Sequence, residues 1–223
     1  MNGFHTILFD LDGTLTDPEE GITKSVQYAL RAFGIEEADR RKLQPFIGPP
    51  LMDSFQEFYG FSEQQSMAAV EKYREYFREQ GIFENIPYPG MQDMLRKLKK
   101  QGRVLAVASS KPEPFVERIL EHFEMAEYFD VVVGATMDEK RSRKEEVVEE
   151  TLARLAALGE TDKSRMVMVG DRKFDVTGAH AFGLQAIGVT YGYAKDGELE
   201  EAGADLVVHN VEELGRALMG ETV

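Results

Sequence analysis

Two aspartates follow the first apolar run of the chain. In the stretch TILFDLDGTLTD, residues 6–17, Asp10 and Asp12 are separated by one residue. In an extended chain this spacing points both side chains to the same side. Two carboxylates about 5 Å apart repel each other by roughly 3 kcal/mol at an effective dielectric constant near 20. The pair therefore predicts either a cation beside the carboxylates or a proton held by one of them.

The composition restricts which cation this can be. The chain has no cysteine and only four histidines. Disulfides, thiolate metal sites and a cysteine nucleophile are therefore excluded, and a zinc cluster of nitrogen and sulfur ligands is disfavoured. We expect a hard metal ion bound by oxygen atoms.

The charge of the chain also excludes classes of partner. The formal net charge is −14, whereas binding to nucleic acid or to an anionic membrane needs a basic face. No apolar run approaches the roughly 20 residues that span a bilayer. The opening MNGFHTILFD has no basic region before its short apolar segment, so we expect no secretory signal. These features predict a cytoplasmic protein with neither a nucleic-acid polymer nor a membrane as partner.

The 223 residues suffice for one large domain or for a domain with a smaller one inserted. Short apolar runs rich in β-branched residues alternate with helical patterns, which predicts a doubly wound, Rossmann-like α/β fold around a mostly parallel sheet. The expected strands are Thr6–Phe9, Val104–Ala108, Val131–Val133, Met166–Val169, Ala186–Val189 and Leu206–Val208. The expected helices lie near 91–101, 112–122, 143–158, 173–182 and 211–219.

One region breaks this alternation. Residues 18–84 show only helical periodicity, with Ser62 as a helix cap and a rigid Gly48-Pro49-Pro50 turn. We therefore expect a helical cap domain at 18–84, inserted into a core domain formed by 1–17 and 85–223. The two crossings, near Thr16–Pro18 and Asn85–Pro89, would form a pair of hinges.

Polar residues follow several of the expected strands. In open α/β sheets, ligands bind beyond the carboxyl ends of the strands. The polar residues there are Asp10, Asp12, Ser109, Ser110, Lys111, Asp171 and Asp175. The sequence thus predicts that four carboxylates and a hydroxyl meet at one edge of the sheet.

Four segments together resemble the haloacid dehalogenase-like hydrolase superfamily. They are DLDGTLTD, VASSKP, a later lysine before a helix, and GDRKFD, in this order along the chain. The likeness is closest to the branch that includes phosphoglycolate phosphatases, pyrophosphatases and 5′-nucleotidases. It spans the whole chain, including a helical cap inserted after the first motif. The resemblance implies a Mg²⁺-dependent phosphatase for a small phosphorylated metabolite.

The resemblance also assigns roles to the carboxylates. Asp10 would attack phosphorus and become a transient aspartyl phosphate. Asp10, the backbone carbonyl of Asp12 and Asp171 would hold Mg²⁺, which bridges the nucleophile and the substrate oxygen. Asp175 would support the waters of the ion or bind it directly. The Asp12 side chain would give a proton to the leaving oxygen and later take one from water. The site would then have both a cation beside the carboxylates and, for part of the reaction cycle, a proton on one of them.

The substrate would contact residues of two kinds. Ser109 would donate a hydrogen bond to a phosphoryl oxygen as a catalytic residue, and Ser110 and Lys111 would bind substrate beside it. Ser110 and Glu113 have the spacing of a capping box. In this branch the cap loop that corresponds to Gly48 and Pro49 closes over the active site, so we expect these residues to contact substrate.

The catalytic lysine is harder to place. Lys144 and Lys111 are both candidates, and we favour Lys144. Ser142 and Glu145 form a second expected capping box, which puts Lys144 in the first turn of a helix. A cation is disfavoured there by about 0.3–1 kcal/mol, so its presence indicates a role. The family position supplies that role, because a lysine there steadies the nucleophile and the transferring phosphoryl group.

Other functions remain as alternatives. A sugar phosphomutase would share every catalytic residue and differ by excluding water from the aspartyl phosphate. A dehalogenase is disfavoured because Asp12 would have no leaving oxygen to protonate. A signalling receiver phosphorylated on aspartate would need neither the second aspartate nor the helical insertion. We expect a monomer or weak homodimer.

Overall fold

The computed structural model describes residues 3–138 and 140–221 of the chain. It divides into two compact units. The larger unit comprises the residues up to Thr16 and those from Pro87 onward, and the smaller one comprises Asp17–Ile86. The short strands β2 (Thr16–Asp17) and β3 (Ile86–Pro87) lie where the chain passes between the units.

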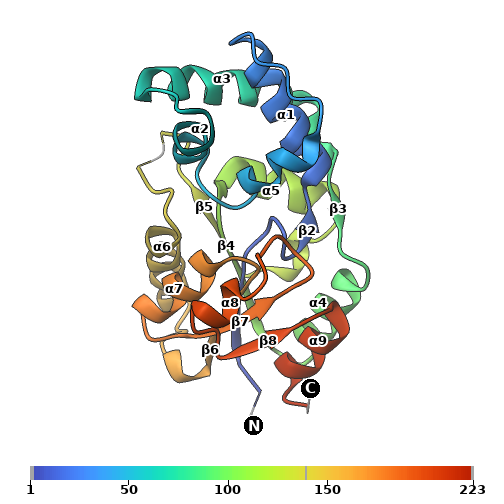
Figure 1. The fold of residues 1–223 in the computed structure, drawn as a ribbon. Helices are drawn as coiled ribbons and strands as arrows, with labels where there is room; N and C mark the ends of the chain where they lie inside the picture. The colour runs from blue at the N-terminus through green and yellow to red at the C-terminus, as the bar shows by residue number, and fades with distance from the viewer. Residues whose placement is uncertain (1–2, 139, 222–223) are drawn as a thin grey trace. The chain divides into compact units, whose positions relative to one another are not determined.

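In the described part of the larger unit, six parallel strands form one sheet in the order β5-β4-β1-β6-β7-β8 (Figure 1). They are β1 (Thr6–Phe9), β4 (Val104–Pro112), β5 (Val131–Ala135), β6 (Met166–Gly170), β7 (Gln185–Val189) and β8 (Leu206–Val208). The predicted α/β class with a mostly parallel sheet is confirmed.

The register of the central strands places the polar residues. Phe9 of β1 lies opposite Val107 of β4 and Val169 of β6. The next residues of the three strands therefore emerge side by side at one edge of the sheet. The hydrogen bonding between β1 and β6 extends one residue further, because the backbone N–H of Asp10 donates to the Val169 carbonyl at 2.9 Å.

Helices connect these strands and cover the sheet. They are α4 (Met91–Lys100), α5 (Glu113–His122), α6 (Lys144–Ala157), α7 (Lys173–Ala181), α8 (Glu198–Glu201) and α9 (Val211–Met219), with short 3-10 turns η3 (Ala126–Tyr128) and η4 (Lys163–Arg165). Leu8 of β1 packs in a buried cluster with Val147 of α6 and Val176 of α7. Side chains alternate along a strand, so Phe9 points to the opposite face, where its ring meets Phe129 edge to face.

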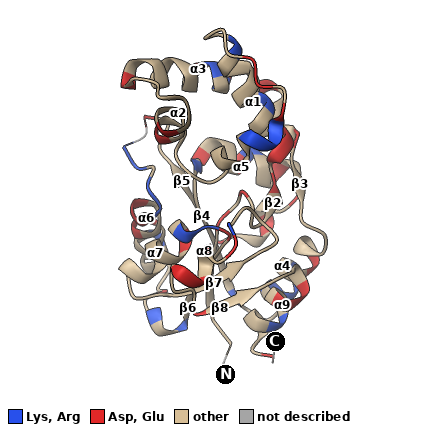
Figure 2. Ribbon diagram, in the orientation of Figure 1, with Lys and Arg blue, Asp and Glu red and all other residues tan. Residues whose placement is uncertain are grey.

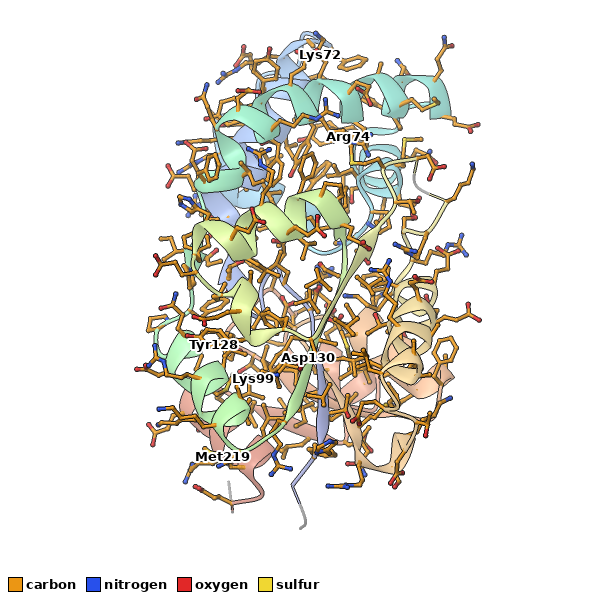
Figure 3. All side chains as sticks on the ribbon, turned by 180° about the vertical axis from the view of Figure 1, so that it is seen from behind. Lys72, Arg74, Lys99, Tyr128, Asp130 and Met219 are labelled. Atoms are coloured by element: carbon orange, nitrogen blue, oxygen red, sulfur yellow. The ribbon has the colours of Figure 1, made fainter. Side chains whose placement is uncertain are left out.

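An ion pair lies at the outer surface of this unit, on the side seen in Figure 3. There Lys99 of α4 reaches Asp130, just before β5, at 2.7 Å. Acidic and basic residues are distributed over many elements rather than gathered on one (Figure 2). Within residues 3–138 and 140–221, none of the helices combines the length and the apolar character needed to cross a bilayer.

The smaller unit is helical. It contains α1 (Glu19–Arg31), η1 (Arg40–Phe46), α2 (Leu51–Tyr59), α3 (Glu63–Glu79) and η2 (Gly81–Phe83). Phe46 and Phe55 are buried with ring centroids 5.0 Å apart, as expected for side chains of a helical core. Ser62 and Gln65 form a capping box at the start of α3, and the predicted Ser62 cap is confirmed.

Candidate active site

Three buried carboxylates meet at the edge of the sheet where β1 and β6 end. Asp10, Asp171 and Asp175 each offer one oxygen atom, and these atoms lie within 4.8 Å of one another. The three residues are at most 4% exposed. Asp10 follows β1 directly, Asp171 follows β6, and Asp175 lies in the first turn of α7. The parallel register of the sheet and one helical turn are enough to bring them together.

Two glycines make room for this cluster. Gly13 has a φ of +81°, and a Cβ atom there would overlap a carboxylate oxygen of Asp171. A Cβ atom on Gly170 would overlap the carboxyl group of Asp175. Any other residue at either position would displace a carboxylate, and at Gly13 it would also strain the backbone.

The two candidate lysines reach different aspartates. The Lys144 Nζ atom lies 3.0 Å from Asp10 Oδ1 and 2.8 Å from Asp175 Oδ1, and it donates to the Ala108 carbonyl at 3.0 Å. The Lys111 Nζ atom instead donates to Asp12 Oδ2 at 2.5 Å. All these side chains are buried. The geometry thus places Lys144 on the expected nucleophile and Lys111 on the expected acid/base.

The burial of these charges shifts their pKa values. Burial, together with the charges of Asp175 and Asp10, raises the pKa of Asp171 well above its usual range. Burial raises the pKa of Asp175 to about 6, although Lys144 opposes this shift. Burial alone would lower the pKa of Lys144, but Asp10 and Asp175 outweigh it and raise that pKa. The cluster therefore has fewer positive charges than its three carboxylates need.

The protonation of Asp12 is set in a similar way. Burial raises the pKa of Asp12 above its usual value, and the ion pair with Lys111 works in the opposite direction. A carboxyl group in such surroundings holds a proton more readily than an exposed aspartate does.

A comparison with protein families identifies this arrangement. The family model of haloacid dehalogenase-like hydrolases matches residues 7–189, which include all the carboxylates and lysines described above. The chain belongs to the haloacid dehalogenase-like hydrolase family. The resemblance predicted from the four sequence motifs is thereby confirmed, and so is the expectation that the chain is an enzyme.

Several members of this family are similar to the chain over most of its length. A protein named 5′-nucleotidase from Pseudomonas aeruginosa is 43% identical over 88% of the chain and 87% of that protein. A protein named tyrosine-protein kinase PtkA from Mycobacterium tuberculosis is 36% identical over 95% of the chain and 72% of that protein. A crystal structure described as a predicted phosphatase from Clostridium acetobutylicum is 45% identical, with a TM-score of 0.92, over 97% of this chain and 99% of that one.

The donor set of this family member fits a magnesium ion. The three grouped ligands are carboxylate oxygens, which Mg²⁺ prefers over nitrogen or sulfur. Burial, and then the charges of neighbouring carboxylates, raise the pKa values of Asp171 and Asp175, and a divalent cation at this position would favour their ionised forms. Asp12 lies apart from this group, with its side chain directed to Lys111. Any role of Asp12 as a metal ligand, through its backbone carbonyl, stays a prediction.

The serines lie beside the site, but their local structure differs from the prediction. Ser109 is buried at 2% exposure, and its hydroxyl accepts the backbone N–H of Lys111 at 3.3 Å. Ser110 does not cap α5, because the N-cap residue is Pro112 and its end has no side-chain cap. The Glu113 carboxylate accepts from the Gly134 N–H and from two arginines, Arg141 and Arg154. The predicted Ser110–Glu113 capping box is therefore wrong.

The second predicted capping box is displaced by one residue. Lys144 is the first residue of α6, and the carboxylate that turns back to the helix start belongs to Glu146, not Glu145. Glu146 accepts the backbone N–H groups of Ser142 and Arg143 at 2.9 and 3.1 Å. The helix begins one residue later than the predicted Ser142 cap implies, so the predicted cap residues are wrong, although Lys144 does lie in its first turn.

The remaining predicted site residues belong to the smaller unit. Gly48 and Pro49 lie in the turn between η1 and α2, where Gly48 has a φ of +104°. Their role in contacting substrate stays a prediction.

Sequence reasoning missed the residues that hold Asp171. The backbone N–H of Tyr193 donates to Asp171 Oδ2 at 2.7 Å, and the Thr14 hydroxyl lies 3.4 Å from Asp171 Oδ1. Thr14 belongs to the first motif and could have been found there. Tyr193 acts through its main chain, so its residue type carries no signal for this contact.

Proposed function

We propose that the chain is a Mg²⁺-dependent phosphatase that transfers the phosphoryl group of a small metabolite to Asp10 and then to water. The observation that carries this proposal is the buried group of three carboxylates with Lys144 against Asp10. Such a site can hold a carboxylate nucleophile and a divalent cation within reach of one phosphate.

The first step would form the aspartyl phosphate. Asp10, Asp171 and Asp175 would hold Mg²⁺, which supplies the positive charge that lets a carboxylate approach a phosphate dianion. An oxygen of Asp10 forms a bond to phosphorus as the bond to the leaving oxygen breaks. Lys144 keeps the Asp10 carboxylate in place through its contacts with Asp175 and the Ala108 carbonyl. Ser109, Ser110 and Lys111 would bind the phosphoryl group from the neighbouring strand end.

Asp12 would move the protons. It gives its proton to the leaving oxygen in the first step and takes one from the attacking water in the second. Water then forms the new bond to phosphorus, and the bond to Asp10 breaks. Lys111 binds Asp12 Oδ2, whereas Asp12 Oδ1 is buried with no hydrogen-bond partner among the described residues. Oδ1, the oxygen that Lys111 does not bind, would therefore be the one that exchanges a proton with the reacting group.

Nucleoside 5′-monophosphates are the first substrates to test. The support comes from the Pseudomonas relative named 5′-nucleotidase, which is 43% identical to this chain. Phosphoglycolate and pyrophosphate-like compounds are the alternatives, and Gly48 and Pro49 of the smaller unit would contribute to the choice. A cytoplasmic location and a monomeric or weakly dimeric state are further parts of this proposal.

A second candidate is transfer of the phosphoryl group to a tyrosine hydroxyl. The support is the mycobacterial relative named tyrosine-protein kinase, at 36% identity. A sugar phosphomutase is a third possibility that would use the same residues. All three begin with a phosphoryl group in this site and differ in the acceptor, which can be measured.

The test is a panel of phosphorylated metabolites assayed for free phosphate, with Mg²⁺ or with EDTA. The panel includes nucleoside monophosphates, phosphoglycolate, pyrophosphate and a sugar phosphate, and tyrosine phosphorylation is followed separately with ATP. We expect Mg²⁺-dependent phosphate release that is lost in the Asp10→Asn variant. Release that persists in that variant, or isomerised sugar phosphate without release, would contradict the proposal.

A further inference from the structure

One carboxylate outside the proposed site, that of Glu198, accepts backbone N–H groups from two segments that lie beside Asp171. Glu198 is the first residue of α8, a short helix whose other glutamates, Glu200 and Glu201, are exposed. The Glu198 side chain is only 8% exposed. Figure 2 shows the acidic α8 near the basic start of α7. A buried carboxylate needs hydrogen-bond donors, and the donors to Glu198 belong to the segments that follow Asp171 and Tyr193.

The first oxygen of Glu198 binds the segment that follows Asp171. Oε1 accepts the Arg172 Nε–H at 3.0 Å and the backbone N–H of Lys173 at 2.9 Å. These donors belong to the two residues directly after Asp171. The contact therefore fixes the path of the chain where it leaves the metal-binding aspartate.

The second oxygen binds the segment that follows Tyr193. Oε2 accepts the backbone N–H of Lys195 at 3.2 Å. Two residues earlier, the N–H of Tyr193 donates to Asp171 Oδ2 at 2.7 Å. Glu198 thus closes a ring of contacts that runs from Asp171 through Arg172 to Glu198, and back through Lys195 and Tyr193.

The loop between β7 and α8, residues 190–197, has little freedom near Asp171. A Cβ atom on Gly192 would overlap the Gly13 carbonyl and the Asp171 side chain, so the two backbones are in close contact. The Tyr191 hydroxyl donates to the Thr14 carbonyl at 3.1 Å. A small displacement of this loop would therefore move the donor that orients the Asp171 carboxylate.

We propose that Glu198 is a positioning residue for the metal ligand Asp171, and that it acts by holding the 190–197 loop against the start of α7. This inference rests on the proposed function, because it assumes that Asp171 binds Mg²⁺. Mg²⁺ demands nearly ideal octahedral geometry, so its affinity depends on how firmly each ligand is oriented. Loss of a residue that orients a ligand typically weakens metal binding by about 10–100-fold.

The test compares Glu198→Gln with Glu200→Gln. Both variants remove one negative charge from α8, but Glu200 is exposed, so its replacement controls for the change in net charge. Mn²⁺ binding is followed by the electron paramagnetic resonance signal of the free ion, and Mg²⁺ by competition. No substrate is present, so the readout does not depend on activity.

We expect Glu198→Gln to weaken Mg²⁺ and Mn²⁺ binding by about 10–100-fold, and Glu200→Gln to leave it within twofold. Phosphatase activity of Glu198→Gln should return to within threefold of the original kcat at saturating Mg²⁺. A purely structural role would instead lower the melting temperature of the metal-free protein and leave the metal affinity of the folded fraction unchanged.

Glu198→Asp keeps the charge but shortens the side chain, and it serves if Glu198→Gln does not fold. We expect it also to weaken metal binding, because the shorter side chain cannot reach all three donors. Metal binding by either folded Glu198 variant within twofold of the original protein would overturn the inference and leave the proposed function standing. An original protein that binds no metal and releases no phosphate would overturn both.

Discussion

Replacing Asp171 by asparagine should stabilise the metal-free protein and abolish its function. Asp171 lies within 4.8 Å of the carboxylate oxygens of Asp10 and Asp175. At that distance each pair repels by about 3 kcal/mol at an effective dielectric constant of 20. Asparagine has nearly the same shape, and its oxygen can still accept from Tyr193. The substitution therefore removes repulsion without leaving a cavity.

Protonation limits the size of this effect. A carboxyl group with an ordinary pKa of 3.8 can take up a proton at pH 7 at a cost of about 4 kcal/mol. The ionised form cannot destabilise the fold by more than this amount, so we expect a gain of about 2–4 kcal/mol. In a protein of this length each kcal/mol corresponds to about 2–4 °C in melting temperature.

The pH dependence gives this prediction a sign that can be checked. A raised pKa in the folded state means that the folded protein binds the proton more tightly than the unfolded chain does. The penalty that Asp171 imposes is therefore largest at neutral pH and falls as the pH is lowered toward 3.8. At pH 5 the gain from Asp171→Asn should be at most about 1.6 kcal/mol.

The assay is calorimetric unfolding in EDTA at pH 7 and pH 5. Asp205→Asn is the control, because hydrogen bonds from Ala186 and His180 outweigh burial and lower the pKa of Asp205. That variant should lose stability at pH 7. Addition of Mg²⁺ should raise the melting temperature of the original protein but not that of Asp171→Asn. A metal-free Asp171→Asn protein less stable than the original would contradict this prediction.

Three further predictions concern the same cluster. Asp10→Asn should lose turnover while keeping the circular dichroism spectrum and cooperative melting of the original, and near-normal phosphate release would remove Asp10 as nucleophile. Lys144→Met should lower the free energy of unfolding in EDTA by about 3–5 kcal/mol, since it leaves buried carboxylates uncompensated, and unchanged denaturant unfolding would contradict this. The Mg²⁺-induced rise in melting temperature should shrink from pH 7 to pH 5, because Asp175, with a pKa of about 6, then binds a proton in competition with the metal; an equal rise at both pH values would argue against the site.

The sheet and the acidic residues at its edge could be predicted from the sequence for a simple reason. Buried parallel strands are short apolar runs, and Leu206–Val208 and Thr6–Phe9 have the predicted bounds. Strand ends in a parallel sheet meet at one edge, so residues 161 positions apart, such as Asp10 and Asp171, could be expected together. The spacing of Asp175 after Asp171 then needed only one helical turn.

The contacts that orient the site could not be predicted in the same way. A capping box predicted from spacing assumes where the helix begins, and an error of one residue assigns Glu145 in place of Glu146. Glu113 was available as a cap for α5 but forms ion pairs with arginines that are distant in sequence. Tyr193 acts through its backbone N–H, and Glu198 through other backbone groups. Such contacts depend on how a loop folds back, which residue types alone do not specify.

The proposed mechanism requires that Asp10 carries the phosphoryl group during turnover. The most direct measurement mixes the protein with acetyl phosphate or an accepted substrate and Mg²⁺, quenches it in acid within milliseconds to seconds, and maps the peptides by mass spectrometry after borohydride reduction. We expect a modified Asp10 that forms only with Mg²⁺ and disappears as phosphate is released. Phosphate release at full rate with Asp10 unmodified at every time point would contradict it.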